Sequence, residues 1–231
     1  MKILLTGATG YIGRRLLPVL VDKGHQVVCL VRDARRLPLP EALKQRVTVV
    51  EGDLLKPETL AGIPEDIDAA YYLVHSMSQS ATDFQRLEKE SAQNFVNRIL
   101  QTRCGQIIYL GGITYEAEKS PHLASRLMVE NILKECGIPY TNLRAGIIIG
   151  SGSASFEIIR DLVEKLPVMI APKWLNTRHQ PIAIRDVIFY LSAVLGNPQC
   201  LNKSFDIGGP DILTYKEMLL VVAKVRGLKR F

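Results

Sequence analysis

The sequence predicts an α/β fold in which helices cover both faces of a doubly wound parallel sheet. Three observations support this. The chain opens on a short apolar strand, a glycine-rich turn and an amphipathic helix, over residues 2–23. Strand-like and helix-like segments then alternate, which indicates β-α-β units with right-handed crossovers. The length of 231 residues allows one large domain, or one domain with a small appendage.

The first element is a buried strand at residues 2–6, followed by Gly7, Gly10 and Gly13 and then by a helix over residues 11–23. Gly7 allows a tight turn, Gly10 lets a phosphate approach the backbone, and Gly13 lets the helix pack on the strand. The helix N-terminus offers free N–H groups and a positive dipole end to an anion. In this context the glycine spacing predicts a dinucleotide cradle. The expected contacts are Gly7, Thr9, Gly10, Tyr11, Ile12 and Gly13.

Hydrophobic periodicity places the remaining elements. Further strands are expected at residues 26–31, 47–51, 68–74, 106–110, 140–143 and 204–207. Helices are expected at residues 57–61, 82–102, 121–136, 156–165, 187–195 and 214–225. The whole chain, 1–231, is expected to form a single domain, to which residues 151–231 contribute a smaller lobe on the substrate side. No terminating element precedes Phe231, which is compatible with truncation from a longer protein.

The composition is that of an ordinary globular protein, with 47% hydrophobic and 23% charged residues. No apolar run reaches the length of a membrane span. The apolar stretch Ile3 to Leu5 is too short for the core of a signal peptide. We therefore expect a cytoplasmic protein.

The formal net charge is +6, but the basic residues are scattered among 23 acidic ones. There is no zinc finger, no RNA-binding strand and no basic helix, so nucleic acid is not the expected partner. The densest basic cluster, Arg32, Arg35 and Arg36, is assigned to a cofactor phosphate below. The four cysteines lack metal-binding spacing, and no metal site is expected.

Four motifs together resemble the short-chain dehydrogenase/reductase superfamily: TGATGYIG at 6–13, Arg32-Asp33, Gly52-Asp53-Leu54, and LRAG at 143–146. The resemblance is closer to its extended and atypical members, namely nucleotide-sugar epimerases, NmrA-like NADP-binding proteins and the Rossmann-type accessory subunit of respiratory complex I. It covers nearly the whole chain and implies an NAD(P)-binding Rossmann fold. It says much less about the reaction.

The resemblance also bears on the choice of cofactor. In this family an acid at the end of the second strand accepts the 2′-hydroxyl of NAD, whereas an arginine pairs with the 2′-phosphate of NADP. Arg32 occupies that position and favours NADP, although Asp33 could serve the ribose of NAD instead. Asp53 and Leu54 match the family residues beside the adenine. The alternative for Asp53 is a turn-forming aspartate after a strand.

The family's catalytic residues are replaced. Active members use a Ser or Thr after the fifth strand and then Tyr-x-x-x-Lys on the next helix. The corresponding positions here hold Gly111 or Gly112, His122 and Arg126. His122 can transfer a proton near neutral pH, and Arg126 can bind a ribose or phosphate. The alternative for His122 is a structural role at the helix start.

Two further places are candidates for the reacting part of the site. Tyr115 and Lys119 form the only literal Tyr-x-x-x-Lys match, but they precede the helix start, so Tyr115 is either a displaced acid or part of a chance match. His75-Ser76 follows the fourth strand, whose end faces the nicotinamide in this fold. We therefore expect His75 and Ser76 on the substrate side.

These features predict an NADP-dependent oxidoreductase of the atypical short-chain type, with an unidentified small-molecule substrate. The alternative is a non-catalytic NADP-binding redox sensor or assembly factor, which the replaced catalytic set favours. A nucleotide-sugar epimerase or dehydratase ranks third because it needs a Tyr base where His122 stands. The sequence leaves open whether the protein is an enzyme, as well as its oligomeric state.

Overall fold

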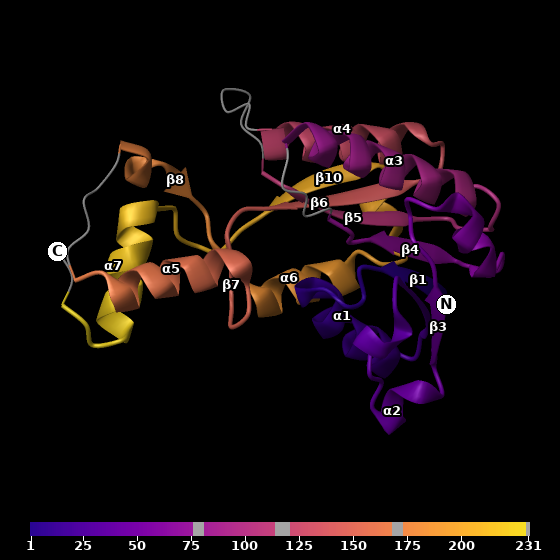
Figure 1. Ribbon diagram of the computed structural model, residues 1–231, viewed down its shortest axis with the longest axis horizontal. Coiled ribbons are helices and arrows are strands. Elements are labelled where there is room, and N and C mark those ends of the chain that lie inside the picture. Colours follow the sequence, from indigo (N-terminus) through magenta and orange to yellow (C-terminus); the bar gives the residue numbers. More distant parts are fainter. Residues whose placement is uncertain (76–80, 114–120, 168–172, 230–231) are drawn as a thin grey trace. The chain divides into compact units, whose positions relative to one another are not determined.

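The computed structural model describes residues 1–75, 81–113, 121–167 and 173–229. It confirms the doubly wound α/β fold, with a seven-stranded sheet in the order β10-β6-β5-β4-β1-β2-β3 (Figure 1). The pairs β1–β2, β2–β3, β1–β4 and β4–β5 are parallel. The strand order reverses between β1 and β4, and in open α/β sheets a ligand binds at the carboxyl ends of the strands next to such a reversal.

The strands of the sheet are β1 (Lys2–Thr6), β2 (Gln26–Val31), β3 (Val47–Glu51), β4 (Ala69–Tyr72), β5 (Ile107–Gly112), β6 (Tyr140–Ala145) and β10 (Lys203–Ile207). The helices are α1 (Tyr11–Asp22), α2 (Glu41–Lys44), α3 (Ala81–Ile99), α4 (Pro121–Glu135), α5 (Ala154–Lys165), α6 (Ile184–Ala193) and α7 (Tyr215–Val225). Short 3₁₀ turns are η1 (Ala34–Arg36), η2 (Pro57–Gly62), η3 (Lys173–Asn176) and η4 (Pro198–Cys200).

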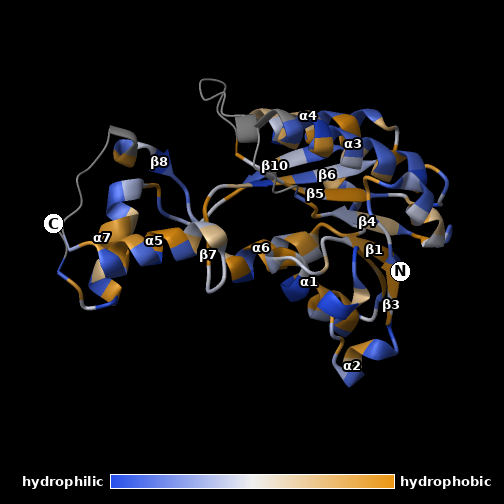
Figure 2. Cartoon of the chain, viewed as in Figure 1, coloured by the Kyte–Doolittle hydropathy of each residue, from blue (hydrophilic) through white to orange (hydrophobic). Residues whose placement is uncertain are grey.

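The central strands are buried on both faces, as near-continuous apolar runs predict for a parallel sheet. Figure 2 shows β1 and β5 largely in the orange of hydrophobic residues. On the face covered by α3 and α4, the ring of Tyr72 packs edge-on against Phe95 at 4.9 Å. On the other face, the Tyr71 hydroxyl donates to the carbonyl of Leu191 in α6. Helices therefore hold both faces of the sheet.

A buried hydroxyl ties together the ends of the two central strands. Thr6 Oγ1 donates to the carbonyl of Tyr71 and accepts from the N–H of Leu73. β1 and β4 also pair in parallel, with Leu5 opposite Tyr71. The residues that follow each strand therefore emerge next to one another at the carboxyl edge of the sheet.

The chain divides into two compact units. The first comprises residues 1–144 and 188–205 and holds the whole seven-stranded sheet apart from the ends of β6 and β10. Residues 188–205, which the sequence analysis assigned to the smaller lobe, have most of their contacts with this first unit. The buried Gln106 amide donates to Thr141 Oγ1 and to the carbonyl of Val194, and β10 extends the sheet beside β6.

The second unit comprises residues 145–187 and 206–231. Its core is formed by α5 and α7, with Ile159, Val163 and Met218 buried. Its short strands are β7 (Ile148–Ile149) paired with β9 (Ile182–Ala183), and β8 (Arg178–His179) paired with β11 (Leu213–Thr214). Across the described residues, no helix is both long enough and apolar enough to cross a membrane.

Candidate functional site

Two of the three glycines in the first turn are required by the chain's own packing. Gly7 has φ +71°, and a Cβ there would lie 2.5 Å from the carbonyl oxygen of Leu73. A Cβ on Gly13 would lie 2.3 Å from the carbonyl oxygen of Gly7. Any side chain at either position would force the turn away from β4 or from α1.

Gly10 is less tightly enclosed than Gly7 and Gly13. It is exposed, and among the described residues a Cβ there would meet only the carbonyl oxygen of Gly7 within 4 Å, at 3.1 Å. Gly10 is also the N-cap of α1, and no side chain caps this helix. The open space and the uncapped N–H groups fit the phosphates of a dinucleotide.

The other expected contacts of the turn lie on the same rim. Thr9, Tyr11 and Ile12 are each half-buried. The Tyr11 ring is covered by the Arg15 guanidinium, whose carbon lies 3.9 Å from the ring centroid. The Tyr11 hydroxyl is buried, and within the described residues it has no hydrogen-bond partner. A bound group could supply that partner.

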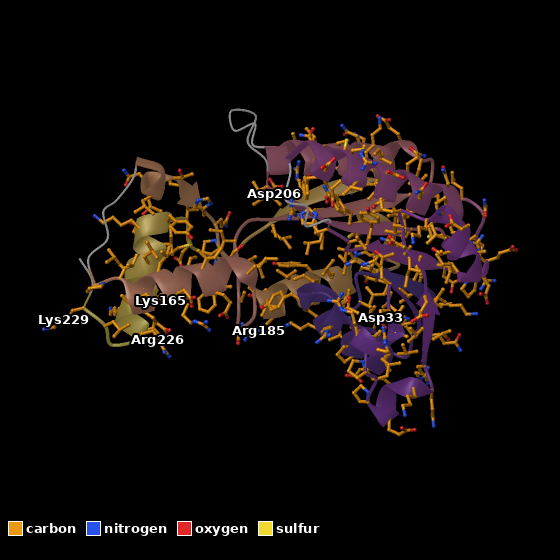
Figure 3. All side chains as sticks on the ribbon, in the orientation of Figure 1. Asp33, Lys165, Arg185, Asp206, Arg226 and Lys229 are labelled. Carbon is orange, nitrogen blue, oxygen red and sulfur yellow. The ribbon has the colours of Figure 1, made fainter. Side chains whose placement is uncertain are left out.

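The residues at the end of β2 are the ones expected to contact the adenosine ribose of the cofactor. Asp33, labelled in Figure 3, caps η1 by accepting the backbone N–H of Arg35. Its two carboxylate oxygens also accept hydrogen bonds from Nε and Nη2 of Arg35, each with a nitrogen–oxygen distance of 2.9 Å. These hydrogen bonds from Arg35 lower the pKa of Asp33. Arg32 is exposed at the same strand end.

Two contacts fix the loop that carries these residues. Glu51, at the end of β3, accepts the N–H of Ala34 at 2.7 Å. Arg14, in the first turns of α1, donates to the carbonyl of Arg36 at 2.9 Å. The arginine loop is therefore anchored to β3 and to the helix that follows the glycine turn.

Asp53 and Leu54 have structural roles that the sequence could not separate from cofactor contact. Asp53 Oδ1 accepts the N–H of Leu55, the turn-forming interaction named as the alternative above. Leu54 is buried in the main core, and its carbonyl accepts the side-chain amide of Asn94. Their place at the carboxyl end of β3 is still compatible with contact to an adenine.

At the end of β5, the expected Ser and Lys positions meet in space. A Cβ on Gly112 would lie 3.2 Å from Cδ of Arg126 and 3.8 Å from Nη1. The arginine side chain therefore lies over the glycine, and it would shift slightly to admit a side chain there. Arg126 is half-buried and forms no ion pair with an acid of the described residues. It presents a permanent positive charge at this edge.

A histidine and a buried acid meet at the end of β4. His75 Nδ1 lies 3.3 Å from Oε2 of Glu88 in α3. The Glu88 side chain is 2% exposed, whereas that of His75 is 35% exposed. Phe84 packs edge-on against the imidazole, with ring centroids 5.9 Å apart. The sequence analysis expected His75 on the substrate side but missed its partner.

A signal for Glu88 was present in the sequence. It stands at helical spacing between Phe84 and Ala92, so the apolar face of α3 carries one acid. Asn142 was also missed: its side chain is buried beside Gly111, with no partner among the described residues. An apolar strand with a single amide gives little warning of such a site.

Four residues that the sequence analysis considered for the site have no described side chain. Tyr115 and Ser76 lie outside the described residues, as does Lys119. His122 is in the first turn of α4, but its side chain is not among those described. Their proposed roles stay predictions.

The fold and the glycine turn define a dinucleotide-binding protein of the Rossmann type. Residues 7–165 match the NAD(P)H-binding family, and the chain belongs to that family.

Curated relatives differ in function. The photosystem II assembly factor Ycf39 of Synechocystis is 29% identical over 153 residues, 65% of this chain and 46% of that protein. The isoflavone reductase homolog IRL of Zea mays is 29% identical over 233 residues, 98% of this chain and 74% of that protein. The chain thus spans less than half the length of the Synechocystis relative.

Solved structures share the fold. The UDP-glucuronic acid 4-epimerase of Bacillus cereus, in complex with NAD, superposes with a TM-score of 0.80 at 19% identity. The superposition covers all of this chain and 87% of the epimerase. At that identity the likeness shows the fold alone.

Proposed function

We propose that this protein is an NADP-dependent oxidoreductase of the atypical short-chain type, acting on a small-molecule substrate. The preference for NADP over NAD is supported by the hydrogen bonds that the Asp33 carboxylate already accepts. Arg35 occupies both carboxylate oxygens, so the acid is already paired and Arg32 is the exposed side chain at the end of β2. A guanidinium binds a 2′-phosphate through two parallel hydrogen bonds.

The bound cofactor would supply or accept a hydride. The residues of this chain would hold it: the backbone at Gly10 and the N-terminus of α1 for the pyrophosphate, and Arg32 for the 2′-phosphate. Arg126, over Gly112, would meet the nicotinamide ribose or an anionic part of the substrate.

NADPH fluorescence on titration with the purified protein tests this proposal. Replacing Arg32 by Ala is expected to weaken NADPH binding about 10- to 100-fold, the value of a charge-assisted hydrogen bond. NADH binding should not change, because NADH has no 2′-phosphate. Arg86→Ala, which removes an arginine paired with Glu90 on α3, is the matched control. Equal loss of NADPH and NADH affinity in Arg32→Ala would contradict the assignment.

The second candidate function is a non-catalytic NADP-binding sensor or assembly factor. It is favoured by the glycine at position 112, which offers no hydroxyl where the family's serine is expected and which instead lies against the Arg126 side chain. A relative named as an assembly factor is compatible with it. Turnover of NADPH with a panel of aldehydes, ketones and quinones separates the two: an enzyme consumes NADPH with some member, and a sensor binds it without consuming it.

A cytoplasmic setting is part of the proposal. All four cysteines are free, and burial raises the pKa of Cys29 to about 12, so it is an inert thiol. Reduced thiols are typical of the cytoplasm. A fluorescent fusion found at a membrane or in an oxidising compartment would contradict this.

A further inference from the structure

We propose that His75, oriented by Glu88, is the proton-transfer residue of this site. The proposal rests on the oxidoreductase function above and deepens it, since the family's usual proton donor is replaced. Three observations support it: His75 follows β4 at the carboxyl edge of the sheet, its imidazole contacts the buried carboxyl of Glu88, and the nearby tyrosines are buried.

The sheet places His75 beside the cofactor cradle. Tyr72 of β4 pairs with Tyr109 of β5, and His75 and Gly112 each lie three residues further along. Gly7 on the other side packs against Leu73. His75 therefore emerges between the glycine turn and the Gly112–Arg126 contact, at the edge where the reacting end of a dinucleotide would lie.

The partner of His75 fixes its protonation pattern. Where the Glu88 carboxylate accepts the hydrogen bond of this contact, the proton between the two residues lies on Nδ1 of the imidazole. The opposite nitrogen, Nε2, is then the one that gains and loses a proton. A carboxylate that orients a partly exposed histidine is one arrangement used in general acid–base catalysis.

The neighbouring groups are poorly suited to the same task. Tyr72 is 1% exposed, and burial raises its pKa well above the usual range. Burial also raises the pKa of Tyr109. Arg126 cannot release its proton, and Glu130 accepts a hydrogen bond from Ser204.

With a carbonyl substrate, the bound cofactor would supply a hydride to the carbonyl carbon and would itself be oxidised. The π electrons of the C=O bond would pass to oxygen, which would take the proton from Nε2 of His75 to give the alcohol. His75 is left neutral, with its remaining proton on Nδ1 toward Glu88, and a proton from water restores it.

The test follows NADPH absorbance with the full chain and two carbonyl probes, nitrobenzaldehyde and diacetyl. His75→Gln is expected to lower kcat about 100-fold or more while NADPH binding, followed by fluorescence, is unchanged. Because reduction needs the protonated histidine, the wild-type rate should fall as pH rises. Added imidazole should restore part of the activity of His75→Ala. His25→Gln, a histidine before β2 at the opposite edge of the sheet, is the matched control.

Glu88→Gln distinguishes an orienting partner from a merely structural one. It removes the charge that favours the protonated imidazole, so the fall in rate should move to lower pH and kcat should drop about 10-fold. Glu90→Gln, an exposed acid on the same helix, should leave the profile unchanged.

Three results would overturn the inference. The first is a kcat of His75→Gln within about twofold of wild type. The second is an unshifted pH profile in Glu88→Gln. The third is a wild-type protein that binds NADPH but reduces neither probe. Failure of the wild type to bind NADPH at all would instead remove the proposed function, and this inference with it.

Discussion

The two halves of the candidate site are built differently. Around β1 and β2 the cofactor cradle is made of backbone, where Gly7 and Gly13 are demanded by packing and Gly10 leaves open space. Around β4 and β5 the site is made of side chains, where Arg126 lies over Gly112 and His75 meets Glu88. A backbone cradle tolerates few changes, whereas a side-chain constellation can be exchanged on the same fold.

This difference explains why the family could be identified while the reaction could not. The glycine turn indicates that the chain binds a dinucleotide. The other half shows an arginine against Gly112 and a histidine paired with a buried acid, and these two contacts do not name a reaction.

The largest expected effect comes from the glycines. Gly13→Ala puts a Cβ 2.3 Å from the carbonyl oxygen of Gly7, so it should cost about 3 kcal/mol of stability, or about 10 °C in Tm. Gly10→Ala should leave Tm within about 2 °C but weaken NADPH binding at least about 10-fold. Thermal denaturation and NADPH fluorescence measure the two. If both variants lose stability equally, the two glycines do not differ as described.

The contact across β5 and α4 should appear as an energetic coupling. Gly112→Ser pushes against the Arg126 side chain and should cost about 1 kcal/mol in denaturant unfolding. In an Arg126→Ala background that cost should disappear, a coupling energy of about 1 kcal/mol. The same cost in both backgrounds would show that the two positions are independent.

The smallest expected effect is on the choice of cofactor. Arg35→Ala frees the Asp33 carboxylate to accept a ribose hydroxyl, and should shift the ratio of NADH to NADPH affinity about fivefold toward NADH. Because Arg35 lowers the pKa of Asp33, the pair is fully formed above the unfolded value of about 3.9 and is lost only as pH falls through the lowered value. The measurement therefore belongs at neutral pH, and an unchanged ratio would contradict the role of the pair.

Much of the fold could be predicted because it follows from local pattern. Glycine spacing, apolar strands and helical periodicity gave the order of elements and the cradle. The sequence did not indicate that residues 188–205 pack with the first unit. This packing depends on long-range contacts, such as the hydrogen bonds from the Gln106 side-chain amide to Thr141 and to the carbonyl of Val194.

The reacting part of the site was less accessible to sequence reasoning. Gly112 and Arg126 were each identified, but their mutual contact depends on how α4 packs on β5. Glu88 looked like one more acid on an amphipathic helix. Only the packing of α3 turns it into the buried partner of His75.

The choice between NADP and NAD is tested most directly by the ratio of NADPH to NADH dissociation constants for the wild-type chain at neutral pH. If Arg32 holds a 2′-phosphate as proposed, NADPH should bind at least about 10-fold more tightly than NADH, because the exposed guanidinium would bind the additional phosphate. Equal affinities, or no binding of either nucleotide, would contradict it.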